Sequence, residues 1–517
     1  MNIQQWFILF LIAQLIHGLG TWKMYVAAGR KPWEAFVPVY NAYVLTKIIN
    51  RSWWWVLLLF VPMINVIMFG VVWVETARSF GKYTKTHTFL TLVTLGFYLY
   101  YLNYATDLKY EENRSLKART ATGDLISAIV FAVVAATLIH TYVMQPFTIP
   151  TSSLEKTLLV GDFLLVSKMH YGARTPTTAV SFPMVHDTIP FFKVKSYLSW
   201  PQLPYFRLPG FQDIKRNDIV VFNWPVDTVR YFRDQSNIHA YKPLDKKSNY
   251  VKRAVGIPGD SLSIQDGYVY INGQKEQLPE RARLQFSYVI ETNGQPLGSN
   301  FFERYEISDG ASRIGQNQIQ IHALTEAYAA QLKSHPAIAN ITRLVADTTL
   351  TESSIFPNNG KFNWNRDQFG TVYIPKAGDE IQLNRRNFSI YRYAIEAYEN
   401  NTLTWQDGQA VLNGKPASSY TFKQDYYWMM GDNRHNSEDS RYWGFVPFDH
   451  VVGKPVFVWM SIEGITQGFS NWKPRWNRFF TTVSGSGEPV SYFKYFLIAI
   501  GLWFVISKLI RRKQKKA

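Results

Sequence analysis

A hydroxyl-rich segment directly follows an apolar run in this chain of 517 residues. Residues 147–153 read Phe-Thr-Ile-Pro-Thr-Ser-Ser, and the apolar run before them ends near Met144. A run of about 20 apolar residues is long enough to cross a bilayer, so we expect these hydroxyls to lie where the chain leaves a membrane. A serine there could attack a substrate at the bilayer surface, provided that a base takes up its proton.

The base that such a hydroxyl needs is not evident among the histidines, because none stands in a telling local arrangement. The Gly-x-Ser-x-Gly turn of many serine hydrolases is also absent around Ser153. Lysine can replace histidine when burial lowers its pKa from ~10.4 by several units. Strand alternation in residues 250–255 places Lys252 on the same face as the small Ala254, which leaves room for its side chain. The same alternation also suits a solvated lysine.

Residues 431–444 form a third segment, which is rich in charges of both signs. It reads Gly-Asp-Asn-Arg-His-Asn-Ser-Glu-Asp-Ser-Arg-Tyr-Trp-Gly. Its acidic residues and His435 could bind a metal ion, but Arg434 and Arg441 lie among them and would repel a cation. We therefore expect no metal here, and a salt-bridged loop is the simpler interpretation.

Together these segments resemble the bacterial type I signal peptidases, a family of membrane-bound serine/lysine proteases. The family's motif Ile-Pro-Ser-Gly-Ser-Met-x-Pro-Thr-Leu aligns with residues 149–158, and its motif Lys-Arg-Ala-Val-Gly-x-Pro-Gly-Asp aligns with residues 252–260. Residues 431–444 are close to the family's last signature. The motifs occur in the family's order and after an apolar run, which argues against chance agreement.

The resemblance implies a role for several residues in these motifs. Ser153 would be the nucleophile and Lys252 the general base, and the reaction would need no cofactor. The Ser153 backbone N–H and the Thr151 hydroxyl would bind the oxyanion, while Ser437 would orient the lysine amine. Four charged residues would brace the loop that carries Ser437, namely Arg253, Asp432, Asp439 and Arg441.

Several positions depart from the family's motifs. Thr151 keeps a hydroxyl where serine is frequent, whereas Ser152 replaces glycine and Lys156 replaces proline. Leu154 replaces methionine with little change in volume. His435 stands where the family usually has an acidic residue, which puts the contact made there in doubt. None of these changes removes a hydroxyl or an amine that the reaction requires.

Residues 146–490 must supply the fold that brings the segments together. Short apolar or alternating runs bounded by Gly, Pro and Asp predict β strands, for example at residues 163–166. Residues 265–273 (QDGYVYING) and 406–414 (QDGQAVLNG) are similar and predict two related hairpins, unless common turn dipeptides coincide by chance. We expect a mostly β exported catalytic domain with a signal-peptidase-like β fold, attached to several transmembrane α-helices.

Two insertions are expected in this domain, near residues 170–211 and 280–400. The first is rich in Pro, Phe, Tyr and Trp and has few acidic residues. Such a composition suits a surface that rests in the lipid headgroup layer, although ordinary loop packing would also explain it.

Five apolar stretches approach the length that a membrane helix requires, at residues 6–19, 54–74, 89–104, 125–144 and 493–510. The first lacks the basic leading end and cleavage site of a removable export signal, so we interpret it as a retained anchor. We therefore expect the chain to be divided as follows: about three transmembrane helices in residues 1–123, an anchor helix at 124–145, the peptidase domain, a C-terminal transmembrane helix at 491–510, and a basic cytoplasmic tail at 511–517.

The net charge of +17 helps to orient these segments. Lys and Arg gather after the first stretch, before the fourth and in the tail, as is typical of cytoplasmic loops. The peptidase domain would then lie on the extracytoplasmic or periplasmic side of the cytoplasmic (inner) membrane. Residues 78–85 would also lie outside although they are basic, which weakens the bias. The chain has no Cys, so disulfides and thiolate chemistry are excluded.

The sequence thus predicts a multi-pass membrane serine endopeptidase that removes signal peptides from exported preproteins. The expected partners are preprotein signal peptides and the lipid bilayer, and an export channel is a possible third. A non-catalytic, membrane-anchored peptidase-like protein that binds exported chains is the alternative. A nucleic-acid binder is less favoured, because much of the positive charge lies in predicted membrane loops. Nothing in residues 1–123 indicates a role for them.

Overall fold

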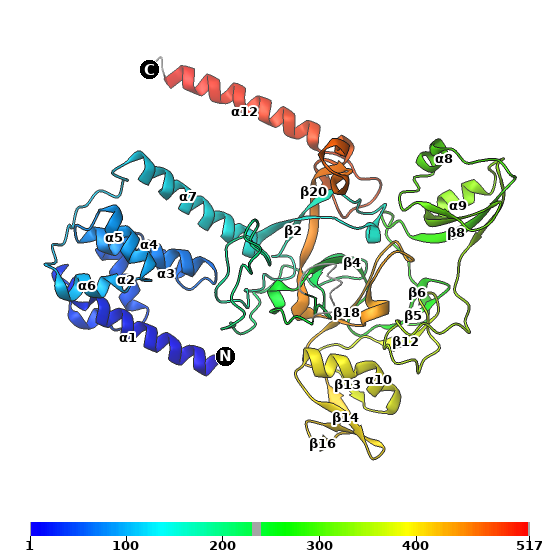
Figure 1. Cartoon of the computed structure of the whole chain (residues 1–517), viewed down its shortest axis with the longest axis horizontal. Helices are drawn as coiled ribbons and strands as arrows, with labels where there is room; N and C mark the ends of the chain where they lie inside the picture. The colour runs from blue at the N-terminus through cyan, green and yellow to red at the C-terminus, as the bar shows by residue number, and fades with distance from the viewer. Residues whose placement is uncertain (1, 230–238, 515–517) are drawn as a thin grey trace. The chain divides into compact units, whose positions relative to one another are not determined.

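The computed structural model describes residues 2–229 and 239–514, which divide into two units. The first unit comprises Met1–Val143, Arg174–Leu208 and Thr228–Lys246, and the second comprises Met144–Ala173, Pro209–Asp227 and Lys247–Ala517. The first is largely helical and the second largely β (Figure 1). The predicted fold class, a mostly β catalytic region joined to apolar helices, is confirmed.

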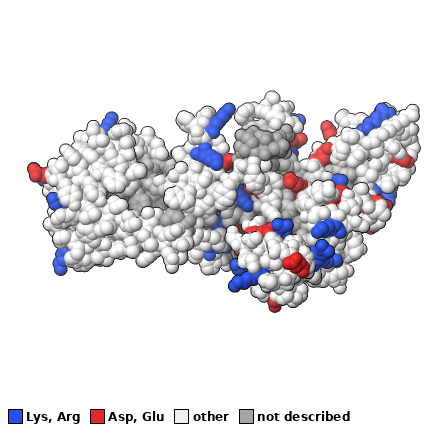
Figure 2. All heavy atoms as spheres, turned by 60° about the horizontal axis from the view of Figure 1, so that its bottom comes forward, with Lys and Arg blue, Asp and Glu red and all other residues white. Residues whose placement is uncertain are grey.

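Helices α1, α2, α4 and α6 of the first unit contribute to an apolar core that includes Met24, Val44, Ile49, Phe80 and Leu102, and α7 packs against α4 in a second cluster. On the face shown in Figure 2, few charged side chains lie over this unit. Its helices are α1 (Ile3–Ala27), α2 (Tyr40–Ile48), α3 (Trp55–Leu58), α4 (Ile64–Ser79), α5 (Lys85–Val93), α6 (Tyr98–Ala105) and α7 (Ala121–Leu138).

Three helical segments among the described residues are long and apolar enough to cross a membrane, at Ile3–Ala27, Ala121–Val143 and Phe493–Ile510. The stretches at 54–74 and 89–104 do not form continuous helices. The first is interrupted between α3 and α4, where Met63 adopts a φ of 67°, and the second between α5 and α6, where Leu95 adopts a φ of 49°.

The ends of each interrupted stretch lie close together. Arg51, before the first stretch, forms a 2.8 Å ion pair with Glu75 just after it. Around the second stretch, the Glu111 N–H donates to the Ser79 carbonyl at 2.9 Å, and Arg119 lies 3.3 Å from the Tyr83 ring. The structure therefore places residues 78–85 and 109–119 in contact with each other, whereas the sequence predicts that they lie on opposite sides of a bilayer.

The second unit is built on a large antiparallel sheet with nine strands among the described residues. Its main path runs β1–β2–β20–β3–β4–β18–β19, and β21 and β22 both pair with β20. Figure 1 labels β2, β20, β4 and β18 of this sheet. The strands are β1 (Met144–Thr148), β2 (Asp162–Ser167), β3 (Ile219–Asn223), β4 (Asn249–Gly256), β18 (Tyr426–Met430), β19 (Val446–Pro447), β20 (Val451–Glu463), β21 (Lys473–Pro474) and β22 (Thr481–Thr482).

Smaller sheets and helices complete this unit. One sheet has the order β11–β8–β10–β9, and α8 and α9 contribute to its apolar core. Its elements are β8 (Gln285–Thr292), α8 (Ser299–Arg304), β9 (Ala311–Arg313), β10 (Gln318–Thr325), α9 (Glu326–Leu332) and β11 (Ile338–Arg343). The others include β12 (Phe369–Tyr373), β13 (Glu380–Gln382), α10 (Arg385–Tyr393), β17 (Ser419–Thr421), α11 (Ser440–Trp443) and α12 (Phe493–Gln514).

The two similar sequence segments form related meanders, as predicted. The first consists of β5 (Ser261–Gln265), β6 (Tyr268–Ile271) and β7 (Gln274–Lys275), and the second of β14 (Leu403–Gln406), β15 (Gln409–Leu412) and β16 (Lys415–Pro416). In both, the Asp-Gly pair of the first turn has positive φ, with 50° and 77° at residues 266 and 267 and 48° and 80° at residues 407 and 408. Positive φ at both central residues is the type I′ geometry that closes a two-residue hairpin.

Residues 174–208 form an irregular arm held by isolated bridges, such as Thr178 with Gln202 and Thr188 with Lys195. Large apolar side chains on the arm are open to solvent, with Phe191 99% exposed and Trp200 71% exposed. These side chains fit the predicted contact with lipid headgroups, which stays a prediction.

Candidate active site

Ser153 lies on a short turn that the apolar core holds in place. Strand β1 ends at Thr148, and Ser153 follows in the 3₁₀ turn Ser152–Leu154. Ile149, Leu154 and Leu158 on either side are buried in one cluster beneath the sheet. Because these anchors flank the turn, the position of the Ser153 hydroxyl is set by packing rather than by a flexible loop.

Lys252 comes to this turn from the centre of the sheet. It lies in β4, opposite Val220 of β3, and β18 pairs with the other edge of β4. Its Nζ atom is 2.6 Å from Ser153 Oγ. Both residues are buried, with 3% of Lys252 and 7% of Ser153 exposed. The structure therefore brings together the two residues for which the resemblance implied catalysis.

The surroundings of Lys252 favour its neutral form more than water does. Burial lowers the pKa of Lys252 from 10.5 to about 8, although the nearby carboxylates of Asp439 and Glu438 act in the opposite direction. A substantial fraction of the amine is consequently neutral near pH 8 and able to accept a proton from the hydroxyl beside it.

Asp432 and Arg253 form a buried ion pair next to the dyad. The guanidinium donates to both carboxylate oxygens, at 2.7 Å from Nε and 2.6 Å from Nη2. The Thr157 hydroxyl also donates to Asp432, at 2.6 Å. Burial raises the pKa of Asp432, but Arg253, the Thr157 hydroxyl and Arg434 together lower it below its usual value, so that the carboxyl stays ionised. The pair connects β4 to the loop after β18, and Thr157 connects it to the segment that follows Ser153.

Asp439 and Arg441 form a second buried pair in the loop after β18. Arg441 donates to both Asp439 oxygens, at 2.9 and 2.8 Å, and to the Arg434 carbonyl at 2.6 Å. The Gly431 N–H donates to Asp439 at 3.2 Å. Within the described ranges, no group of three or more His, Asp or Glu residues is placed to hold a metal ion.

Gly431 allows the loop to approach the nucleophile. A Cβ atom added to it would lie 2.3 Å from Ser437 Oγ and 2.5 Å from the Ser153 carbonyl oxygen. The Ser437 hydroxyl helps to lower the pKa of Asp439, yet it makes no well-directed hydrogen bond to a residue in the described part of the chain. The bond from Ser437 to Lys252 that the resemblance implied is thus not formed in this structure.

Residues to which the resemblance assigned no role also hold the Ser153 turn in place. The Asn433 N–H donates to the Ser153 carbonyl at 3.1 Å. The side chains of Asn433 and Asn436 both donate to Asp309, at 2.5 and 2.8 Å, and Asn436 donates to Ser152 Oγ at 3.0 Å. Asp309 lies between α8 and β9, far from any motif, so no signal in the sequence pointed to it.

Gln285, the first residue of β8, joins the two catalytic segments. Its side chain donates to the Glu155 carbonyl at 2.8 Å, and its backbone N–H donates to the Asp432 carbonyl at 3.0 Å. It is completely buried. Gln285 belongs to none of the motifs, so it was not predicted either.

Two departures from the family's motifs have partners in the structure. Lys156 adopts a φ of 70°, which the ring of proline forbids, and its ammonium is 3.2 Å from Glu306. His435 accepts from the Ser287 N–H at 3.0 Å through Nδ1, so its Nε2 carries the proton and donates to Asp367 at 2.9 Å. The family usually has a carboxylate at the position of His435, and here Asp367 supplies a carboxylate beside that position.

Two family models match the chain. The model described as "Signal peptidase, peptidase S26" matches residues 122–325 and 372–460, which include both members of the dyad. A model described as a family of unknown function (DUF5684) matches residues 33–113. The peptidase match omits residues 326–371, which lie within the segment that was predicted to contain an insertion.

Curated bacterial relatives carry the name signal peptidase I. The relative from Rickettsia massiliae is 31% identical over 337 residues, 65% of this chain and 79% of that protein. The relative from Buchnera aphidicola subsp. Schizaphis graminum is 26% identical over 326 residues, 63% of this chain and 71% of that protein. The relative from Haemophilus influenzae is 24% identical over 387 residues, 73% of this chain and 80% of that protein.

The buried pair predicts a large loss of stability when its cation is removed. Arg253→Met leaves Asp432 ionised and unpaired in the interior, so we expect the free energy of unfolding to fall by about 3–5 kcal/mol. The control is Arg392→Met, which removes an ion pair between more exposed side chains and should change stability by less than about 1 kcal/mol. Denaturant unfolding of the purified chain measures both, and equal losses would contradict this account of the site.

Proposed function

The chain belongs to the signal peptidase family, peptidase S26, and we propose from this premise that Ser153 and Lys252 cleave signal peptides from exported preproteins. One observation carries the proposal, the 2.6 Å approach of Lys252 Nζ to Ser153 Oγ inside the protein. A lysine buried beside a hydroxyl and away from a direct carboxylate partner is suited to act as a base.

The reaction proceeds in two steps. The neutral Lys252 amine accepts the Ser153 proton while Oγ attacks the scissile carbonyl carbon, and the resulting ammonium protonates the leaving amine as the peptide bond breaks. Water then attacks the acyl-enzyme ester, and Lys252 again accepts and returns the proton. No cofactor takes part in either step.

The oxyanion is bound by the Ser153 N–H and the Thr151 hydroxyl. Thr151 is half-buried directly before the nucleophile turn, and among the described residues its hydroxyl has no hydrogen-bond partner, so it is free to donate to a substrate. A donor of this kind contributes about 2.7–4 kcal/mol to catalysis. Ser437 Oγ lies beside Gly431 and has no hydrogen-bond partner among the described residues, and we infer that it orients the lysine when substrate binds.

Substitution of either dyad member should abolish cleavage. We expect Ser153→Ala and Lys252→Met each to lower kcat/KM for a preprotein in detergent by at least about a thousandfold, because neither step can proceed without them. The matched controls Ser263→Ala and Lys275→Met change strand residues outside the site and should retain activity. Substantial turnover by either dyad variant, with the fold intact by circular dichroism, would refute the mechanism.

The lysine base also predicts the pH dependence. Below about pH 8 the Lys252 amine is protonated, so kcat/KM should fall with decreasing pH, by up to about tenfold per unit. Since the Glu438 charge raises the pKa of Lys252, Glu438→Gln should move this acid limb to lower pH. Glu380→Gln, a change in β13 away from the dyad, should leave the limb in place. An acid limb that is the same in all three proteins would argue against lysine as the base.

The contacts of the helical unit support a membrane topology with three spans. If α1, α7 and α12 cross, the two interrupted stretches enter the bilayer and return to the side they left, since their ends are in contact. Residues 28–120 and the tail then lie in the cytoplasm, and the peptidase domain lies outside the inner membrane. This arrangement puts Arg78, Lys82 and Lys85 on the same side as the other basic loop residues, in agreement with the positive-inside rule.

Single-cysteine labelling tests this topology, because the natural chain has no Cys. In intact cells stripped of their outer membrane, Lys85→Cys and Lys117→Cys should be protected from an impermeant maleimide, whereas Lys376→Cys in the peptidase domain should react. Reaction of Lys85→Cys alone from the outside would instead support a crossing by each apolar stretch.

A further inference from the structure

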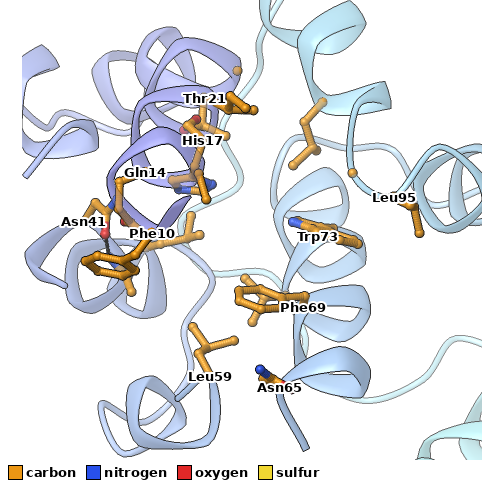
Figure 3. A pocket seen from close by; sticks show the side chains of 18 of the residues that line it. Phe10, Gln14, His17, Thr21, Asn41, Leu59, Asn65, Phe69, Trp73 and Leu95 are labelled. Atoms are coloured by element: carbon orange, nitrogen blue, oxygen red, sulfur yellow. Dashed lines mark hydrogen bonds between the residues drawn. The ribbon is translucent and has the colours of Figure 1, made fainter. Parts of the chain in front are cut away.

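A cavity of about 560 Å³ lies inside the helical unit, between α1, α4 and the turn that precedes α6 (Figure 3). Helix α1 contributes one face at helical spacing, with Phe10, Gln14, His17 and Thr21. Its volume is within the ~300–1,000 Å³ typical of small-molecule sites. No part of the peptidase mechanism uses this cavity.

The interruptions of both re-entrant stretches border the cavity. Leu59 and Phe60 belong to the first interruption, and Leu95 and Gly96 to the second. Gly96 has a φ of 84°, and a Cβ atom added to it would lie 2.7 Å from the Trp73 ring. The absence of a side chain at Gly96 therefore allows the Trp73 ring to pack against it in the cavity wall. Irregular backbone at membrane depth occurs where it is buried in protein or lines a cavity. Both interruptions fit this rule, because their residues form part of the cavity wall.

Two polar groups face each other across the cavity without a hydrogen-bond partner in the described part of the chain. Figure 3 shows His17 of α1 and Trp73 of α4 pointing toward each other, and Asn65 lies about two helical turns away at the beginning of α4. Within the described residues, no hydrogen bond involves the His17 ring or Trp73 Nε1. Polar groups in apolar surroundings are stabilised when a bound molecule supplies hydrogen bonds.

The lining also excludes charged ligands. It contains no Asp, Glu, Lys or Arg, and its other residues are mainly aromatic or aliphatic. The charged residues of this unit pair elsewhere, as Arg51 and Arg114 do with Glu75. A ligand that carried a full charge would lose its hydration here without gaining a counterion.

We propose that this cavity binds one uncharged amphiphile from the lipid phase, of the monoacylglycerol type. Its hydroxyl or carbonyl head hydrogen-bonds to His17 and Trp73, and its tail lies against Phe10, Phe69 and the neighbouring aliphatic side chains. The inference goes beyond peptide cleavage and gives residues 3–105 a function, while relying on the proposed membrane location of α1.

Native mass spectrometry of the delipidated full-length protein in detergent tests the proposal. The probe is 1-oleoylglycerol, and its charged analogues with the same chain are oleate and oleylamine. We expect saturable binding of one 1-oleoylglycerol molecule and at least tenfold weaker binding of both charged analogues, because of their desolvation.

Two variants locate the site. Ala13→Phe fills the cavity from α1 and should abolish binding, whereas the control Ala27→Phe, on an exposed part of the same helix, should bind like the natural chain. His17→Leu keeps the volume, removes the head contact and should weaken binding by about tenfold. Preprotein cleavage by the same samples reports separately on the peptidase, and Ser153→Ala should bind the probe normally.

The proposal is overturned if the natural chain shows no saturable binding of the neutral probe, or binds oleate or oleylamine equally well. Equal affinities of Ala13→Phe and Ala27→Phe would place any bound lipid elsewhere and would also overturn it. If Ala13→Phe does not fold, the volume-conserving His17→Leu decides between a specific site and adventitious lipid.

Discussion

The structure of the peptidase site depends on keeping an amine partly neutral inside a cluster of acidic residues. Burial lowers the pKa of Lys252, but the charges of Asp439, Glu438 and Asp432 oppose that shift. Arg441, which pairs with Asp439, lowers the pKa of Lys252 and so offsets part of this opposition. Arg253 forms the corresponding ion pair with Asp432. The Asp439–Arg441 pair therefore contributes to the charge balance around the Lys252 amine as well as to the shape of the loop.

Segments outside the family's motifs complete the same site. Asp309 holds two asparagines of the catalytic loop, Glu306 pairs with Lys156, and Asp367 accepts from His435. Each contact fixes one of the two catalytic segments to the part of the domain between residues 285 and 367. Lys156 stands where the family has proline, and His435 stands where it usually has an acidic residue. Both have partners from distant parts of the sequence, Glu306 for Lys156 and Asp367 for His435. The part of the domain between residues 285 and 367 therefore helps to position the segments that contain Ser153 and Ser437.

The sequence could reveal local structure but not the long-range pairing. The hairpins at 265–273 and 406–414 follow from turn chemistry that acts within four residues, and they were predicted correctly. Ser153 and Lys252 are 99 residues apart, and nothing in strand alternation says that their side chains meet. The family resemblance supplied that pairing. It could not supply Gln285 or Asp309, because a buried amide or a half-buried carboxylate in a variable segment leaves no recognisable pattern.

Apolar length predicts membrane helices at residues 54–74 and 89–104, whereas the structure interrupts both stretches. Hydropathy measures whether a segment is stable in lipid, whereas the side on which it emerges depends on contacts at its two ends. Glu75 shows the difference, because it accepts from Arg78 on its own helix and also from Arg51 and Arg114, whose loops strict alternation would place on the opposite side from Glu75. These contacts require the end of the first stretch to lie beside both loops. Under the proposed topology with three spans, the basic residues in 78–85 follow the same rule of orientation as those of the other loops.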